Sequence, residues 1–196
     1  MATIAGVTGV DSSSSRSLKF SGYFWGLLRI LIGWNFLWAF FDKLFGLGFA
    51  TCRAPTGGTI DTFCSAAFVK GGSPTYGFLT FGTKASHTGS LFDWLASSGP
   101  THQNVTDWLF MAVLLGVGVA LTLGVFVRIT GIGAALVLTF MYLAGFVWPQ
   151  NNPFLDDHIL QIVALVGIVV ADAGQYLGLG RWWARKQFVQ RHPILK

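Results

Sequence analysis

The sequence has little charge for its length. Only 11% of its 196 residues are charged, whereas 53% are hydrophobic. Soluble domains carry roughly 25% charged residues. This shortage, together with long apolar runs, argues against an ordinary soluble domain and leaves no separate soluble core to build.

Histidine and cysteine are also scarce, which restricts the cofactors that the chain can hold. It has four histidines and two cysteines. Only His158 lies next to a predicted spanning helix, so the two facing histidines of a bis-histidine haem are missing, and two cysteines are too few for an iron–sulfur cluster. There is no glycine-rich dinucleotide fingerprint and no phosphate loop. The sequence therefore indicates no haem, flavin or metal, and an electron carrier would be a bound quinone, the cysteine pair or a partner subunit.

Long runs without charge are the strongest structural signal that is present. Leu109–Val127 and Ile129–Val147 each contain 19 uncharged residues, enough to cross a hydrocarbon core of about 30 Å as a helix. Two further runs are interrupted once each, by Arg29 and by Asp172. The sequence predicts an all-α integral membrane protein, a four-transmembrane-helix bundle, with spans at about 22–47, 107–127, 129–148 and 158–178.

The remaining segments complete the predicted domain organisation. Residues 1–19 are expected to be a disordered tail, 20–179 the membrane domain, and 180–196 a basic tail. A long extracytoplasmic insert, 48–106, separates the first two spans. Lys and Arg gather on the side of the termini, so the positive-inside rule predicts a multi-pass plasma-membrane protein with both termini cytoplasmic. The net charge of +5 then reflects topology and attraction to anionic lipid, with no nucleic-acid partner.

Both cysteines, Cys52 and Cys64, fall in the predicted insert. An oxidising compartment outside the cell favours a disulfide between them. A redox-active pair is the alternative, although the spacing is not Cys-x-x-Cys and no helix start that would activate a thiol is evident.

A polar island, Asn151–His158, stands between the last two spans. Its carboxylates and imidazole cost several kcal/mol to desolvate without partners. One interpretation is a loop that caps the last helix. The other is a site for protons or a polar head group at the membrane surface, formed by His158, Asp156 and Asp157 together with Asp42 and Lys43 from the outer end of the first span.

Deeper polar and aromatic residues give two further hypotheses. Arg29 and Asp172 are expected at similar depth, so we predict that they form a buried ion pair, with Arg128 as the alternative partner of Asp172. Trp34 and Trp38 lie one turn apart on the first span and either pack against neighbouring helices or line a pocket for a flat ligand.

Four segments carry a resemblance to a known family. They are Arg29-x-x-x-Gly33, residues 36–46, Asn151–His158 and residues 177–183. In these segments the chain resembles the DoxX/DoxD family of four-helix membrane proteins, and within it the DoxD branch, the large subunit of thiosulfate:quinone oxidoreductase.

The resemblance implies oxidation of thiosulfate or a related sulfur compound, with electrons passed to ubiquinone or menaquinone, in company with a small extracytoplasmic subunit. It is also compatible with a homo-oligomer in the lipid bilayer. The alternative is a non-catalytic scaffold or accessory subunit of a respiratory or redox complex. The expected catalytic residues are His158, Asp156, Asp157, Lys43 and Asp42, and the expected quinone-binding residues are Trp34, Trp38, Arg29 and Asn152.

Overall fold

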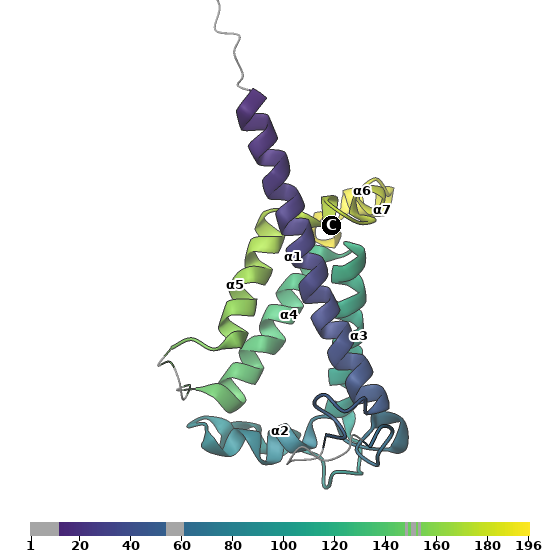
Figure 1. The fold of residues 1–196 in the computed structure, drawn as a ribbon, viewed down its shortest axis with the longest axis vertical. Coiled ribbons are helices and arrows are strands. Elements are labelled where there is room, and N and C mark those ends of the chain that lie inside the picture. The colour runs from purple at the N-terminus through teal and green to yellow at the C-terminus, as the bar shows by residue number, and fades with distance from the viewer. Residues whose placement is uncertain (1–11, 54–60, 148, 150–151, 153) are drawn as a thin grey trace, which may run out of the picture.

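Four helices form the body of the molecule (Figure 1). The structure is a computed structural model that describes residues 12–53, 61–147, 149, 152 and 154–196. Over these residues it is all-helical, without strands. The four helices are α1 (Ser12–Phe45), α3 (Val105–Leu123), α4 (Val127–Met141) and α5 (Asp157–Val170).

Three segments within this fold are long and apolar enough to cross a membrane. They are Phe20–Phe45, Val105–Leu123 and Val127–Phe146. The last combines α4 with a π-helical turn, η4 (Tyr142–Phe146). Helix α5 has 14 residues, about 21 Å at 1.5 Å per residue, which is shorter than a hydrocarbon core.

The ends of α1 and α5 differ from the predicted ends. Helix α1 begins at Ser12, whereas the sequence predicts a disordered tail over residues 1–19, and residues 1–11 lie outside the described part of the chain. Helix α5 ends at Val170 and not near residue 178, because Asp172 adopts a left-handed conformation with φ of 48°. A short 3₁₀ turn, η5 (Ala173–Gln175), follows.

The segment between α1 and α3 folds into a layer of short helices, which we call the cap. Figure 1 shows it lying across the lower ends of the long helices. The cap contains η1 (Phe68–Lys70), α2 (Tyr76–Thr80), η2 (Gly82–Ala85) and η3 (Gly89–Leu95). The predicted disulfide between Cys52 and Cys64 is confirmed.

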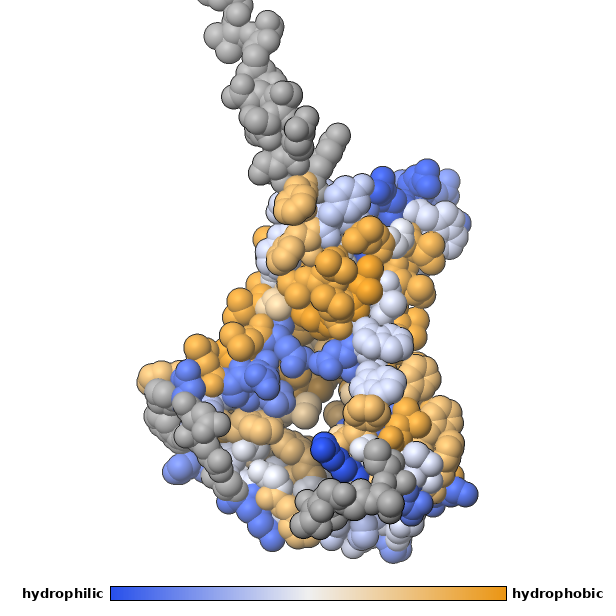
Figure 2. Space-filling view, viewed as in Figure 1, coloured by the Kyte–Doolittle hydropathy of each residue, from blue (hydrophilic) through white to orange (hydrophobic). Residues whose placement is uncertain are grey.

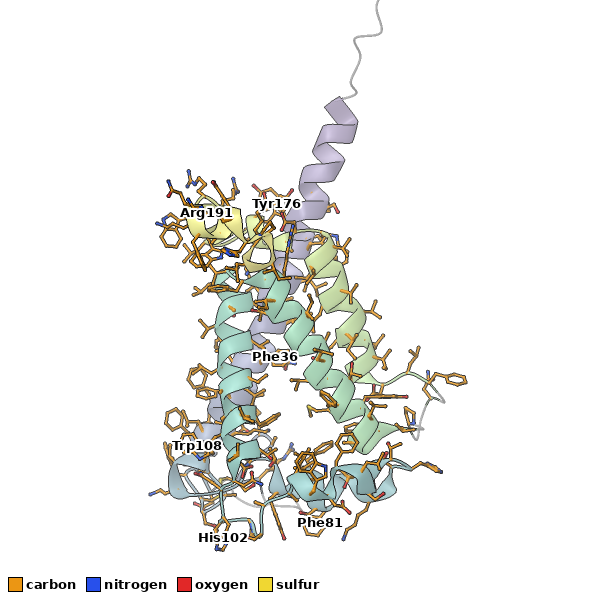
Figure 3. All side chains as sticks on the ribbon, turned by 180° about the vertical axis from the view of Figure 1, so that it is seen from behind. Phe36, Phe81, His102, Trp108, Tyr176 and Arg191 are labelled. Carbon is orange, nitrogen blue, oxygen red and sulfur yellow. A yellow bond between two sulfur atoms is a disulfide. The ribbon has the colours of Figure 1, made fainter. Side chains whose placement is uncertain are left out.

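The C-terminal segment folds against the opposite end of the bundle. It comprises α6 (Gly180–Ala184), α7 (Gln187–Arg191) and η6 (Pro193–Leu195). Trp183 Nε1 donates to the Leu195 carbonyl at 2.6 Å, and Arg128 N donates to the Lys196 carbonyl at 3.0 Å. Figure 3 shows the two ends, with Tyr176 and Arg191 at one and Phe81 and His102 at the other.

The core lies among α1, α3, α4 and α5, and α1 and α3 approach each other closely within it. A Cβ built on Gly33 would come 2.7 Å from Thr122 N, and one built on Gly118 would come 2.8 Å from Leu37 N. Small residues therefore allow the two backbones to approach closely, as is usual for helices in membranes. Phe36, in the middle of the bundle (Figure 3), is buried in this core.

Candidate functional site

A cavity of about 470 Å³ lies between the bundle and the cap. Such a volume suits a small-molecule ligand. Figure 2 shows the hollow at the junction of the upper bundle and the lower cap, with hydrophilic side chains beside it. Its walls are mostly apolar and aromatic, and they include Phe36, Phe78, Phe92, Phe110, Phe140 and Met141.

The cavity wall carries one charge among the residues that the structure describes, Lys43 on α1. Within the same described part of the chain, Lys43 makes no hydrogen bond or ion pair. A half-buried cation without a hydrogen-bond acceptor is unfavourable in an apolar setting. A ligand that offers Lys43 a negative or hydrogen-bond-accepting oxygen would offset this cost.

Four uncharged polar side chains share the wall with Lys43. Asn35 comes from α1, Thr75 from the cap, Thr106 from α3 and Gln161 from α5. Neither Asn35 nor Gln161 makes a hydrogen bond to any described residue. The amide N–H groups of both are therefore free to donate to a ligand.

Asp42, next to Lys43 in the sequence, has a different role. Its carboxylate is buried and accepts hydrogen bonds from the backbone N–H groups of residues 49, 50 and 51 at 2.9–3.0 Å. These bonds fix the loop that leads to Cys52. Asp42 thus stabilises the turn from α1 into the cap and does not line the cavity.

Asp107 holds the cap onto α3 and is not among the site residues predicted from the sequence. It is fully buried, and its Oδ1 accepts from Ser73 Oγ at 2.7 Å, Thr75 N at 3.1 Å and Thr75 Oγ1 at 2.6 Å. Its Oδ2 accepts from Asn104 N at 3.0 Å, and Asn104 Oδ1 accepts from Asp107 N at 3.1 Å, a capping box. The signal was present, since Asn-x-x-Asp directly before an apolar run predicts such a helix start.

The polar island forms the start of α5, outside the described cavity wall. Asp156 Oδ1 accepts from Ile159 N at 3.1 Å and so caps the helix, while its Oδ2 lies 2.7 Å from His158 Nδ1. The His158 ring packs on Phe146, with ring centroids 4.5 Å apart. Asp157 is exposed.

Asn152 bonds within its own loop, where its Oδ1 accepts from Phe154 N at 3.1 Å and Leu155 N at 3.2 Å. Asn151 and Pro153 lie outside the described residues. Lys43 therefore faces the cavity, Asp42 binds its own turn, and Asp156, Asp157 and His158 sit apart from that wall at the start of α5.

Arg29 lies at the other end of the bundle and is fully buried. It donates to the carbonyls of Leu121, Thr122, Tyr176 and Leu177, the last at 2.7 Å. The first two carbonyls end α3, and the other two belong to the chain after the break at Asp172.

The predicted Arg29–Asp172 pair is therefore wrong. Asp172 instead pairs with Arg128, the alternative partner, at 3.7 Å. The break in α5 presents free carbonyls to Arg29 while Asp172 turns toward the α3–α4 connection. Carbonyl dipoles, not a carboxylate, stabilise the buried guanidinium.

Trp34 and Trp38 lie on the outer surface of α1. Trp34 is 52% exposed, and the two ring centroids are 6.2 Å apart. Together with Leu31 and Asn35 they form a shallow groove. Trp38 also packs edge-on against Phe49 at 5.0 Å, which ties this groove to the turn into the cap.

The fold and the cavity define a class: an all-helical protein with three candidate membrane-spanning helices, suited to a lipid bilayer, with a ligand-sized hollow at one end. Comparison with protein-family models, curated proteins and solved structures finds no match for this chain.

Proposed function

We propose that this chain is the membrane subunit of a quinone-linked oxidoreductase and that it binds the quinone in the cavity between bundle and cap. The observation that carries the proposal is Lys43, a cation in an aromatic wall that makes no hydrogen bond or ion pair among the described residues. A quinone supplies a flat ring for that wall and carbonyl oxygens for the cation.

The polar groups of the wall suit both redox states of such a ligand. Lys43 Nζ donates to one carbonyl oxygen, and the amides of Asn35 and Gln161 are available for the other. Reduction places negative charge on these oxygens, which a neighbouring cation stabilises in a site of low dielectric constant. Lys43 then favours electron transfer to the bound quinone as well as binding.

Protons for the reduction require a titratable group near the cavity. His158 precedes Gln161 by one turn of α5, and its ring packs on Phe146, which stacks on the cavity residue Phe78. Histidine is the side-chain type that exchanges protons near neutral pH. In this proposal Asp156 orients the ring, and His158 passes protons between solvent and the quinone.

The electron donor is proposed from the family resemblance. Two thiosulfate ions joined as tetrathionate release two electrons, which with two protons convert one quinone to a quinol. The cavity offers such a dianion a single described cation. Thiosulfate or a related sulfur compound is therefore expected to react on the cap surface or on a small extracytoplasmic partner.

The quinone bound by purified protein tests the proposal. The protein is extracted from native membranes with a lipid-retaining polymer, and quinone is quantified by mass spectrometry. Lys43→Met should lower the quinone-to-protein ratio at least about fivefold, the equivalent of roughly 1 kcal/mol. Lys70→Met, at an exposed lysine of the cap, is the matched control. An unchanged ratio in Lys43→Met contradicts the proposal.

A non-catalytic scaffold is the second candidate, and one observation favours it. The carboxylates of Asp42, Asp107 and Asp156 all accept hydrogen bonds from backbone N–H groups and so serve structure. Wild-type protein that carries no quinone and does not reduce added quinone with thiosulfate would establish this alternative.

A further inference from the structure

Two hollows of the structure meet at one residue. Asn35 lines the cavity between bundle and cap, and it also lines the shallow groove of Leu31, Trp34 and Trp38 on the outer surface of α1. That groove faces outward from a helix long and apolar enough to cross a membrane. Asn35 therefore lies between the groove on the outer surface of α1 and the cavity wall that carries Lys43.

Asn35 is an unusual residue for this place. It is exposed in the middle of the apolar segment Phe20–Phe45 and makes no hydrogen bond to a described residue. A polar side chain turned toward lipid without a partner is unfavourable. Its position becomes favourable if a polar head group passes or rests beside it.

The groove has the shape and chemistry for an apolar chain. Leu31 is 57% exposed and Trp34 is 52% exposed, so both present large apolar surfaces outside the bundle. Trp38 and its contact with Phe49 form the end of the groove near the cap.

We infer that the ligand is an amphipathic molecule with a long apolar tail, which enters laterally from the bilayer. The tail lies in the groove of Leu31, Trp34 and Trp38, and the head passes Asn35 to reach Lys43. The inference rests on the proposed function for the identity of the head group. It adds that the outer surface of α1 is part of the binding site.

The test compares two probes: a benzoquinone head group with a decyl tail, and the same head group without a tail. Binding is measured by isothermal titration calorimetry on the full chain in nanodiscs of one lipid composition, so that partition of the probe into lipid is the same for all variants. Trp34→Ala should weaken binding of the tailed probe about tenfold, because apolar contact area is lost, and should leave the tail-less probe unchanged.

Matched controls lie on the same helix. Phe24 is 56% exposed and lies outside the groove, so Phe24→Ala should change neither affinity. Leu31→Ala is the second groove variant, with Leu27→Ala as its control, at exposures of 57% and 49%. Leu31→Ala should weaken binding of the tailed probe alone, by about threefold, since fewer atoms are removed than in Trp34→Ala.

The outcomes separate this inference from the proposed function. If wild type binds both probes but Trp34→Ala and Leu31→Ala leave the tailed probe unaffected, the tail groove is refuted and quinone binding stands. Equal losses in Phe24→Ala and Trp34→Ala would also refute the groove, because they indicate a general contact with surrounding lipid. If wild type binds neither probe, both the proposed function and this inference fail.

Discussion

At the residue scale, charge in this protein is divided between structure and ligand. Asp42 and Asp107 each accept several hydrogen bonds and fix the two ends of the cap. Arg29 binds carbonyls that would otherwise have no partner at the opposite end. Lys43 makes no hydrogen bond or ion pair among the described residues, and a ligand oxygen is the acceptor that we propose for it.

Asp107→Ala should lower the free energy of unfolding by about 3 kcal/mol, because buried donors of Ser73, Thr75 and Asn104 would lose their shared acceptor. Thermal denaturation in detergent measures the effect. Asp93→Ala, at an exposed aspartate of the cap, is the control and should stay within about 0.5 kcal/mol of wild type. Similar shifts in both variants would show that Asp107 is not the anchor.

Arg29→Lys should destabilise the protein by about 2 kcal/mol or more, because a single ammonium cannot reproduce the planar fork that reaches four carbonyls. Arg128→Lys keeps a positive partner for Asp172 in a pair that is about one-third exposed, so it should cost less than about 1 kcal/mol. The losses measured for Arg29→Lys and for Asp172→Asn singly should add in the double variant Arg29→Lys/Asp172→Asn. Marked coupling between Arg29 and Asp172 would contradict the structure.

At the element scale, the sequence predicts where the apolar helices lie better than it predicts the residue at which each helix ends. The uncharged runs locate α3 and α4, and helical spacing correctly makes Trp34 and Trp38 neighbours. After α5 ends at Val170, the carbonyls of Tyr176 and Leu177 are bound by Arg29, a residue far away in the chain. Such a partner leaves no local signal.

The candidate site shows the same division. The depth of a residue along its helix follows from counting residues, and this count correctly places Lys43 at the cap end of α1. Counting residues does not show which helices are neighbours or which face each one presents. Asp156 and His158 were therefore expected beside Lys43, whereas the structure places Gln161 on the cavity wall. Gln161 offered only a weak signal, a single polar residue in an apolar run.

The disulfide should act within the cap and not on the cavity. Cys52→Ser combined with Cys64→Ser should lower stability by about 2–4 kcal/mol, the usual range for closing a loop of this size. Quinone content should remain at the wild-type level, since neither cysteine is among the described residues of the cavity wall. Calorimetric unfolding measures the stability, and mass spectrometry of the same sample measures the quinone content. Loss of quinone with intact folding would point instead to a redox role for the pair.

At the scale of the whole molecule, the two ends differ in chemistry. The cap end carries the cavity and the disulfide. The other end carries buried Arg29 and the C-terminal segment, residues 180–196, which has five cationic and no acidic side chains. Figure 1 shows the described start of α1 and the C-terminus at that second end. This asymmetry supports the proposal that the cap is extracytoplasmic and both termini are cytoplasmic.

That topology requires α5 to complete a fourth crossing although it has only 14 residues. We propose that residues 171–177 complete it, because irregular backbone is tolerated at membrane depth where protein groups satisfy it. Arg29 binds the carbonyls of Tyr176 and Leu177, and Gly174 packs on Val127. The end of α5 at Val170 is therefore compatible with a fourth span whose last residues are irregular and are packed against protein groups.

Cysteine accessibility in whole cells tests this arrangement. Cys52 and Cys64 are bonded to each other, so an introduced cysteine supplies the single free thiol. Ser98→Cys, in the cap, should react with a membrane-impermeant maleimide in intact cells, whereas Ser13→Cys and Gln190→Cys should react only after permeabilisation. If Gln190→Cys reacts from outside while Ser13→Cys does not, the chain crosses an odd number of times and α5 is not a span. In that case the cavity would still lie between bundle and cap, but the cationic C-terminal segment would face the same side as the cap, and the positive-inside argument would fail for this protein.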